Sequence, residues 1–352
     1  MTPKRNRKRS RTTRLILLAA GIVLGAGLMR EVRGSNTPDG SATRVVIPRG
    51  ASMRAAADSL AAHDVIGSTR MFRWYASLTG NARDIKPGTY LLPPGAGYAT
   101  VLDALVNGKG VMATVVIPEG FDLRDIAPAL AKALDVPEDS VQAAVTDTAW
   151  VNQLNIPVPS LEGYLFPATY SFPEGTTARE AVNAMVERFL EMWKPEYDIR
   201  LQAMSISRHD AMAMASIVEK EARKPEERAI ISAVYWNRVK AGMLLQADPT
   251  VQYALPRHVG RVLYKDLEVE SKYNTYKHVG LPPGPIASPG VASIEAALSP
   301  ADVPYLFFVA RADGGHEFTR TFEEHTKAIA QIKADARAQR RASGSAEPKG
   351  SR

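Results

Sequence analysis

The sequence predicts a mixed α+β protein, first because one strand–turn–helix pattern occurs twice. VVIPRGASMRAAADSLA begins at Val45 and VVIPEGFDLRDIAPALA begins at Val115, at a constant offset of 70 residues. Each copy reads as a short β-strand, a Pro/Gly turn and an amphipathic helix. Between them, KPGTYLLPPGAGYATVLDALVNG supplies another strand, turn and helix. Strands and helices therefore alternate over residues 44–136, as in a compact α/β or α+β unit.

The second observation is a helical stretch that is followed by a hairpin. Residues 211–222, AMAMASIVEKEA, read as a helix with little polar surface, which is typical of a buried helix. A further helix over residues 226–241 is expected to stop at Gly242, since glycine is favoured just beyond the last turn. YLFFVARADGGHEFTR then reads as a β-hairpin that turns at residues 313–315.

Local signals predict further boundaries. Asp248 and Pro249 in ADPTVQYAL are expected at the N-cap and at the first helical position. Thr321 and Glu324 fit a capping box for the last helix. LPPGPIASPG, residues 281–290, holds four prolines and two glycines, which excludes a helix or an inner strand.

The N-terminal end predicts a membrane anchor. Residues 1–14 hold seven basic residues and no acidic one, and the next fifteen residues, LILLAAGIVLGAGLM, carry no charge. A basic flank before an apolar run favours an N-terminus in the cytoplasm. The run is short for a hydrocarbon core of about 30 Å, so Arg14 and Arg30 would have to reach the interface. A cleaved signal peptide is the alternative, but MREVRG offers no small-residue cleavage site. We therefore expect a basic tip at 1–14, an uncleaved anchor at 15–30 and a body outside the cytoplasm.

The net charge of +7 does not indicate a nucleic-acid partner. The basic tip accounts for seven positive charges, and residues 333–352 add six basic against two acidic residues. Residues 15–332 are therefore about −4 overall, so the folded body offers no basic surface for phosphate. We expect a polar linker at 31–43 and a disordered tail at 333–352.

The residue types exclude several kinds of catalysis. The chain has no cysteine, which rules out disulfides, a thiol nucleophile and cysteine-bound metal. Its six histidines show no ligand spacing, and it contains no phosphate loop, HExxH or GxSxG motif. We therefore expect neither a metal nor a cofactor.

The candidate site that remains is a set of carboxylates with polar and aromatic residues near them in the sequence. Glu219 follows the apolar helix, where it is either part of a solvated helix end or a half-buried acid in a cleft. The other candidates offer the hydrogen bonds and stacking surfaces that a sugar-binding groove needs: Glu162, Gln246, Asp248, Tyr253, Asn274 and Tyr276. The simpler alternatives stay open, because Asp248 also suits a helix cap and the tyrosines also suit a core or its rim.

Five stretches follow one another along the chain: SLEGYLFPATYSF, ASIVEKEA, LLQADPTVQYAL, YNTYKHVGLPPGPIASPG and YLFFVARADGGHEFTRTFEEH. Together they resemble the YceG-like (MltG) family of endolytic murein transglycosylases, in the family's order over residues 44–330. The resemblance implies an α+β protein with one anchor in the cell (inner) membrane and its body facing the cell wall. It also implies a small LysM-like subdomain at 44–136 and a larger catalytic domain at 137–332.

The resemblance further implies the reaction. Enzymes of this family cleave the β-1,4 bond between N-acetylmuramic acid and N-acetylglucosamine in nascent glycan strands, and they leave a 1,6-anhydro-muramyl end. The first glutamate of VEKE, Glu219, is then the general acid and base. One carboxylate can suffice, because the muramyl 6-hydroxyl replaces water. The other candidates would position the sugar or Glu219.

Peptidoglycan glycan strands and cell-wall synthesis enzymes are the partners that the resemblance implies. Two alternatives remain open at this point. One is a wall-binding scaffold without catalysis, and the other is a muramidase hydrolase that uses Asp248 as its second carboxylate.

Overall fold

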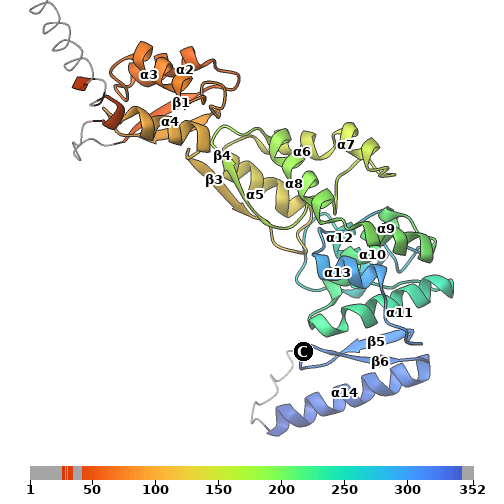
Figure 1. Ribbon diagram of the computed structural model, residues 1–352. Helices are drawn as coiled ribbons and strands as arrows, with labels where there is room; N and C mark the ends of the chain where they lie inside the picture. The colour runs from red at the N-terminus through yellow and green to blue at the C-terminus, as the bar shows by residue number, and fades with distance from the viewer. Residues whose placement is uncertain (1–25, 28, 30, 35–41, 343–352) are drawn as a thin grey trace, which may run out of the picture. The chain divides into compact units, whose positions relative to one another are not determined.

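The computed structural model describes residues 26, 27, 29, 31–34 and 42–342, whose contacts divide the chain into two compact units (Figure 1). The first unit takes in the described residues up to Ala113 together with Ser171–Thr176. The second unit takes in Thr114–Tyr170 and the residues from Thr177 on. This division differs from the predicted boundary near residue 136, because the second copy of the repeated pattern belongs almost wholly to the second unit.

The predicted ends of the chain fall largely outside the described residues. This holds for the basic tip at 1–14 and for most of the anchor at 15–30 and of the linker at 31–43. Within the part of the chain that the structure describes, no helix combines the length and the apolar character needed to cross a membrane.

The first unit is built on an antiparallel strand pair. Its elements in chain order are β1 (Thr43–Ile47), α2 (Met53–Ala62), α3 (Thr69–Leu78), β2 (Gly88–Leu92) and α4 (Tyr98–Asn107). The register runs from Thr43 opposite Leu92 to Ile47 opposite Gly88. Along β1, Val45 and Ile47 are buried while their neighbours are more exposed, as the two-residue period of a strand requires.

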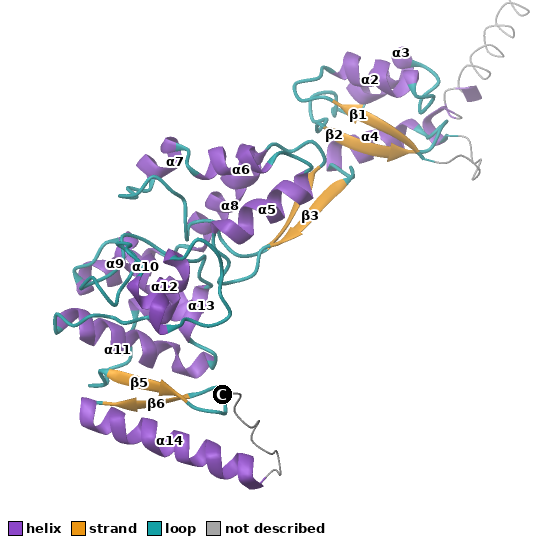
Figure 2. Ribbon diagram, turned by 180° about the vertical axis from the view of Figure 1, so that it is seen from behind, coloured by secondary structure: helices purple, strands orange, loops and turns teal. Residues whose placement is uncertain are grey.

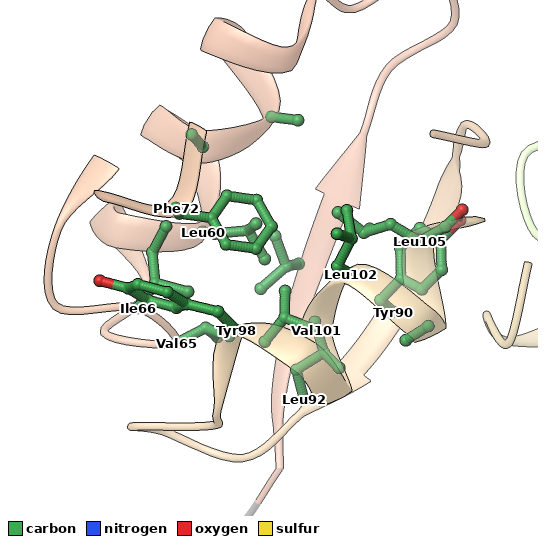
Figure 3. Packing of buried hydrophobic residues seen from close by; sticks show 14 of the residues in the cluster. Leu60, Val65, Ile66, Phe72, Tyr90, Leu92, Tyr98, Val101, Leu102 and Leu105 are labelled. Atoms are coloured by element: carbon green, nitrogen blue, oxygen red, sulfur yellow. Dashed lines mark hydrogen bonds between the residues drawn. The ribbon is translucent and has the colours of Figure 1, made fainter. Parts of the chain in front are cut away.

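The core of this unit draws on α2, α3 and α4 (Figure 3). Leu60 of α2, Phe72 of α3 and Leu105 of α4 are fully buried. The rings of Phe72 and Tyr98 meet edge to face with their centroids 5.5 Å apart. Full burial of each large apolar side chain contributes about 1.5–3 kcal/mol, so the unit has a core of its own.

The second unit begins within a second strand pair. The elements of this part are β3 (Met112–Val116), α5 (Leu123–Leu134), α6 (Glu138–Val145), α7 (Thr148–Gln153), β4 (Thr169–Pro173) and α8 (Ala178–Met192). β3 pairs with β4, and α5, α6 and α8 pack against one another. Ile126, Leu130 and Leu134 recur every four residues along α5 and form its buried stripe.

The repeated sequence pattern folds in the same way twice, as predicted. In each copy a strand runs into a turn whose glycine has a positive φ, 71° at Gly50 and 78° at Gly120. A side-chain oxygen then caps the following helix, from Ser52 in α2 and from Asp122 in α5. A glycine suits the left-handed turn because it has no Cβ to clash.

The helical stretch of the second unit surrounds α10. Its elements are α9 (Pro195–Met204), α10 (Arg208–Glu221), a 3₁₀ turn (Pro225–Glu227), α11 (Arg228–Lys240), α12 (Asp248–Ala254), a 3₁₀ turn (Tyr264–Glu268) and α13 (Val291–Leu298). Every residue from Ala211 to Val218 is buried, and α10 packs against α11, α12 and α13. The predicted buried helix is therefore confirmed. So is the stop after α11, where Gly242 has a φ of 66°.

A hairpin and a long helix complete the second unit. β5 (Phe307–Ala310) pairs antiparallel with β6 (His316–Thr319), and α14 (Phe322–Ala342) packs on both strands (Figure 2). The predicted capping box is present, since Thr321 Oγ1 accepts the Glu324 N–H and the Glu324 carboxylate accepts the Thr321 N–H, each at 3.2 Å. The expected disorder from residue 333 is wrong as far as residue 342. This segment continues α14, because its alanines, lysine, arginines and glutamine are strong helix formers.

Candidate active site

Glu219 lies in the last turn of α10 with only 8% of its side chain exposed. Its Oε2 accepts the backbone N–H of Gly290 at 3.1 Å. Gly290 is the N-cap of α13, so the carboxylate faces the positive end of that helix. Arg228, the first residue of α11, brings Nη2 to 3.9 Å from Glu219 Oε1. Glu219 is therefore held inside the fold rather than in a solvated helix end.

The proline-rich segment 281–290 places Gly290 against Glu219. It forms neither a helix nor a strand, as predicted, and its last residues are buried. The N–H of Ile286 donates to Ser216 Oγ at 3.0 Å, which ties the segment to the buried face of α10. Prolines restrict the backbone on either side of this bond, so the position of Gly290 is set by a stiff segment.

The turn between β3 and α5 also lies beside this segment. Ser288 donates its N–H to the Phe121 carbonyl at 2.7 Å, and its carbonyl accepts the Gly120 N–H at 2.8 Å. Lys220 Nζ donates to the Gly120 carbonyl at 3.1 Å. The turn of the second repeat copy is thus fixed at the C-terminal end of α10.

This turn brings a second carboxylate, Glu119, that the sequence reasoning missed. A Cβ on Gly290 would overlap the Glu119 carboxylate, so this carboxylate lies directly against Gly290. Partial burial raises the pKa of Glu119, the negative charge of Glu219 raises it further, and Arg228 opposes both. The sequence held one signal of this residue. The two copies of the repeated pattern match closely in this turn, but the first copy has Arg49 where the second has Glu119, so the charge at this position is reversed.

Glu162 and Tyr253 form a separate group at the N-terminal end of α5. Glu162 Oε2 accepts the Leu123 N–H at 3.1 Å and the Tyr253 hydroxyl at 3.2 Å, whereas its Oε1 is buried without a hydrogen-bond partner. Burial raises the pKa of Glu162 to about 8, although the Leu123 N–H works in the opposite direction. The partners of Glu162 are thus different from those of Glu219.

Glu162 should make the stability of the second unit depend on pH. Its pKa rises from 4.5 to about 8 on folding, so between these values the folded state holds a proton that the unfolded state has released. The free energy of unfolding therefore falls as the pH rises through this window. We expect Glu162→Gln to melt at a higher temperature than wild type at about pH 8.5 and close to wild type at about pH 5. Thermal melts of both proteins at the two pH values test this. Equal pH dependence in the two proteins would contradict it.

Asp122, Asp125 and His258 lie near this group with the spacing of a metal site, and they are the one such group among the described residues. His258 Nε2 is 3.6 Å from Asp122 Oδ2 and 3.3 Å from Asp125 Oδ1. However, Arg124 already donates from Nε and Nη2 to Asp122 Oδ2, at 3.0 Å and 2.6 Å. Because a guanidinium occupies the face that a cation would need, the arrangement is better explained as an ion-pair cluster.

Asp248, Tyr276 and Gln246 belong to a third group, which includes Glu221. Tyr276 donates its hydroxyl to Asp248 Oδ1 at 2.6 Å, and Tyr235 donates to Glu221 Oε1 at 2.8 Å. Burial raises the pKa of Glu221 to about 7, with a smaller upward contribution from the charge of Asp248. Glu219 and Glu221 therefore have separate partners, as expected for positions two residues apart on a helix. A cavity of about 200 Å³ is lined by Glu221, Tyr235, Arg238, Leu245, Gln246, Asp248 and Phe308.

Asn274, another predicted sugar-binding residue, lies in the interior of the second unit. Its side chain is fully buried, and its Nδ2 donates to the carbonyls of Leu267 and Val269 at 2.8 Å and 2.9 Å. Its Oδ1 accepts the Tyr276 N–H at 3.0 Å. Asn274 therefore shapes the loop that presents Tyr276.

The expected cap at Asp248 is also corrected by one position. Ala247 is the N-cap of α12, and Asp248 and Pro249 are its first two residues. Thr275 Oγ1 accepts the Ala247 N–H at 3.0 Å. The Asp248 carboxylate makes no capping bond, so it stays exposed and free to bind Tyr276.

The comparisons with known proteins agree in pointing to one family. The sequence model of the YceG-like family matches residues 45–331. An endolytic murein transglycosylase of Bacillus subtilis (strain 168) is 37% identical over 332 residues, which cover 89% of this chain and 90% of that protein. An endolytic murein transglycosylase of Streptococcus pneumoniae (serotype 2, strain D39) is 29% identical over 82% of this chain and 58% of its own length. The 2.6 Å crystal structure of a yceG-like protein from Listeria monocytogenes superimposes with a TM-score of 0.57 at 35% identity, over 82% of this chain and 98% of that one. The chain belongs to the YceG-like family.

Proposed function

We propose that this chain is an endolytic murein transglycosylase that cuts the bond between N-acetylmuramic acid and N-acetylglucosamine within glycan strands. The observation that carries the proposal is the position of Glu219. It is a nearly buried carboxylate at the end of a buried helix, fixed by the Gly290 N–H at 3.1 Å. A general acid needs such a fixed position, because proton transfer requires hydrogen-bond reach to the leaving oxygen.

In the proposed reaction Glu219 acts twice. It first donates its proton to the glycosidic oxygen, and the bond from that oxygen to the muramyl C1 breaks. The 6-hydroxyl of the same muramyl residue then bonds to C1 and gives its proton to the Glu219 carboxylate. The acid is thereby regenerated, a 1,6-anhydro ring has formed, and no water is consumed. A second nucleophile is not needed, in contrast to the usual pair of glycosidase carboxylates.

The other predicted residues are proposed to hold the sugar chain. Asp248 and Gln246 are exposed at the cavity of the Glu221 group, and Tyr276 is hydrogen-bonded to Asp248. Carboxylate, amide and phenol groups are suited to sugar hydroxyls. Tyr253 and Glu162 are more enclosed, so we propose that they stabilise the α5 end of the site.

We further propose a LysM-like role in glycan binding for the first unit. The order β1–α2–α3–β2 with an antiparallel strand pair supports this assignment. A cavity of about 500 Å³ within this unit is lined by residues 46–49, 87–89 and 173–175. The basic residues 1–14 and the apolar run after them support the proposal of a single-pass anchor in the cell membrane, with the body outside the cytoplasm and near wall-synthesis enzymes.

A digest of purified peptidoglycan by residues 31–352 tests the proposed function. We expect mass spectrometry to find products with anhydro-muramyl ends, including products from the interior of strands. Free reducing ends would instead indicate a hydrolase. Glycan binding without any cleavage would contradict the enzyme and leave a scaffold.

A further inference from the structure

Helix α3 of the first unit presents a stripe of basic and apolar side chains to solvent. Its opposite face packs into the core through Phe72 and Ala76. Trp74 is 49% exposed and Leu78 is 68% exposed. Three and four residues apart along one face of the helix lie the exposed residues Arg70, Arg73, Trp74, Ser77 and Leu78. The helix has no acidic residue, so this stripe carries a net positive charge.

The chain that precedes the first strand lies against the N-terminal end of α3. The Glu31 carboxylate contacts Gly67, where an added Cβ would lie 3.0 Å from Oε1. The Tyr98 hydroxyl is hydrogen-bonded to the Glu31 side chain and lies 3.4 Å from the carbonyl of Ser68, the N-cap of α3. Val32 packs against the core of the unit. The segment that follows the apolar run is thus attached beside the start of α3.

The proposed membrane anchor therefore ends close to the exposed stripe. The apolar run of residues 15–29 stops two residues before Glu31. Helix α3 has ten residues and is about 15 Å long, and the stripe begins at its second residue. A bilayer surface at the end of the anchor is consequently within reach of the whole stripe.

The chemistry of the stripe suits a surface of anionic lipid. Tryptophan favours the boundary between headgroups and acyl chains, because its ring is apolar and its N–H can stay hydrated. Leucine next to it adds apolar area that can enter the same layer. Arginines are attracted to anionic headgroups. The cavity proposed for glycan is lined by residues 46–49, 87–89 and 173–175, so the two surfaces use different residues.

We propose that α3 rests on the anionic surface of the bilayer, with its arginines against lipid phosphates and with Trp74 and Leu78 in the headgroup layer. This inference rests on the proposed anchor, because the anchor brings α3 to the bilayer. The docked helix holds the first unit, and the glycan cavity within it, at the membrane surface.

The absence of cysteine allows a single thiol to report on docking. Ser77→Cys places a thiol of similar size at an exposed position within the stripe. We expect a water-soluble maleimide to label the full-length variant about tenfold more slowly in vesicles that contain phosphatidylglycerol than in vesicles of phosphatidylcholine alone, because only the undocked form reacts. Glu187→Cys, an exposed position on α8, should be labelled at similar rates in both.

Variants of the stripe test the two kinds of contact. In the Ser77→Cys chain, Arg70→Gln and Arg73→Gln should each raise the labelling rate in the anionic vesicles by about fivefold, up to the rate in phosphatidylcholine. Trp74→Ser should also raise it, although the charge is unchanged. Lys132→Gln removes an exposed positive charge from α5 and should leave the rate as it was.

Flotation of the vesicles separates this inference from the anchor. If the full-length chain did not float with the vesicles, the anchor would be wrong and the inference would fall with it. If the chain floated but the Ser77→Cys thiol reacted equally fast in both kinds of vesicle, the inference alone would be overturned. Slow labelling in both that the arginine variants left unchanged would show that protein covers α3, which also overturns it. The proposed cleavage is measured in solution and is independent of these outcomes.

Discussion

Replacing Glu219 by glutamine is expected to lower the rate of anhydro-end formation by about 10²–10⁴-fold, the usual contribution of a general acid. Glutamine has nearly the shape of glutamate, and its amide oxygen can still accept the Gly290 N–H. It has no acidic proton to give to the leaving oxygen and no carboxylate to take one back. The fold should therefore survive while both proton transfers fail. Initial rates on purified glycan, with thermal melts of the same samples, measure the two effects separately.

Two further variants sharpen this experiment. Glu187→Gln makes the same chemical change on the exposed face of α8 and should leave the rate unchanged. Glu219→Asp keeps an acid but withdraws it by one methylene, so its rate should fall between wild type and Glu219→Gln. If Glu219→Gln kept more than a tenth of the wild-type rate, the acid would have to be another group, and Glu119 would be the first to test.

The parts of the fold that could be predicted are those that depend on short stretches of sequence. The apolar run of α10, the Asp-Gly-Gly turn of the hairpin, the capping box at Thr321 and the repeated turns each depend on residues within a few positions of one another. Periodicity and capping are local effects, so they can be recognised without knowing what packs against them. The resemblance that named the family rested on equally contiguous stretches.

The parts that were missed depend on contacts between distant segments. Glu119 approaches Glu219 because residue 290 is a glycine and because residues 281–290 bond to two different elements. No local sequence pattern indicates that these two carboxylates lie close together. The two carbonyls that accept from the Asn274 amide belong to a loop whose course the sequence does not reveal. Polar residues that shape a site and polar residues that touch a substrate are of the same types. Only their contacts distinguish them.

Arg238 of α11 is a buried charge that joins three segments of the second unit. Its side chain donates from Nε to the Leu306 carbonyl and from Nη1 to the Leu245 carbonyl, both at 2.7 Å. Leu306 leads into the hairpin, and Leu245 leads into the segment with Gln246 and Asp248. The guanidinium also lies over the ring of Phe307 at 5.2 Å. A planar guanidinium donates from separate nitrogens in fixed directions and so reaches both carbonyls, whereas the donors of an ammonium all lie on one nitrogen.

Arg238→Met should therefore produce the largest loss of stability among the variants considered. Methionine fills similar space but leaves two carbonyls without their donor, and each buried group that loses its partner costs about 1–3 kcal/mol. We expect the melting temperature of the second unit to fall by roughly 6–12 °C. The melting temperature of Arg238→Lys should lie between those of wild type and Arg238→Met. Lys240→Met, an exposed change in the last turn of the same helix, is the matched control and should melt like wild type. A melting temperature in Arg238→Met within a degree or two of this control would show that water replaces the lost donors. In that case the position of the segment around Asp248 would have to be maintained by its other contacts, among them those of Thr275 and Tyr276.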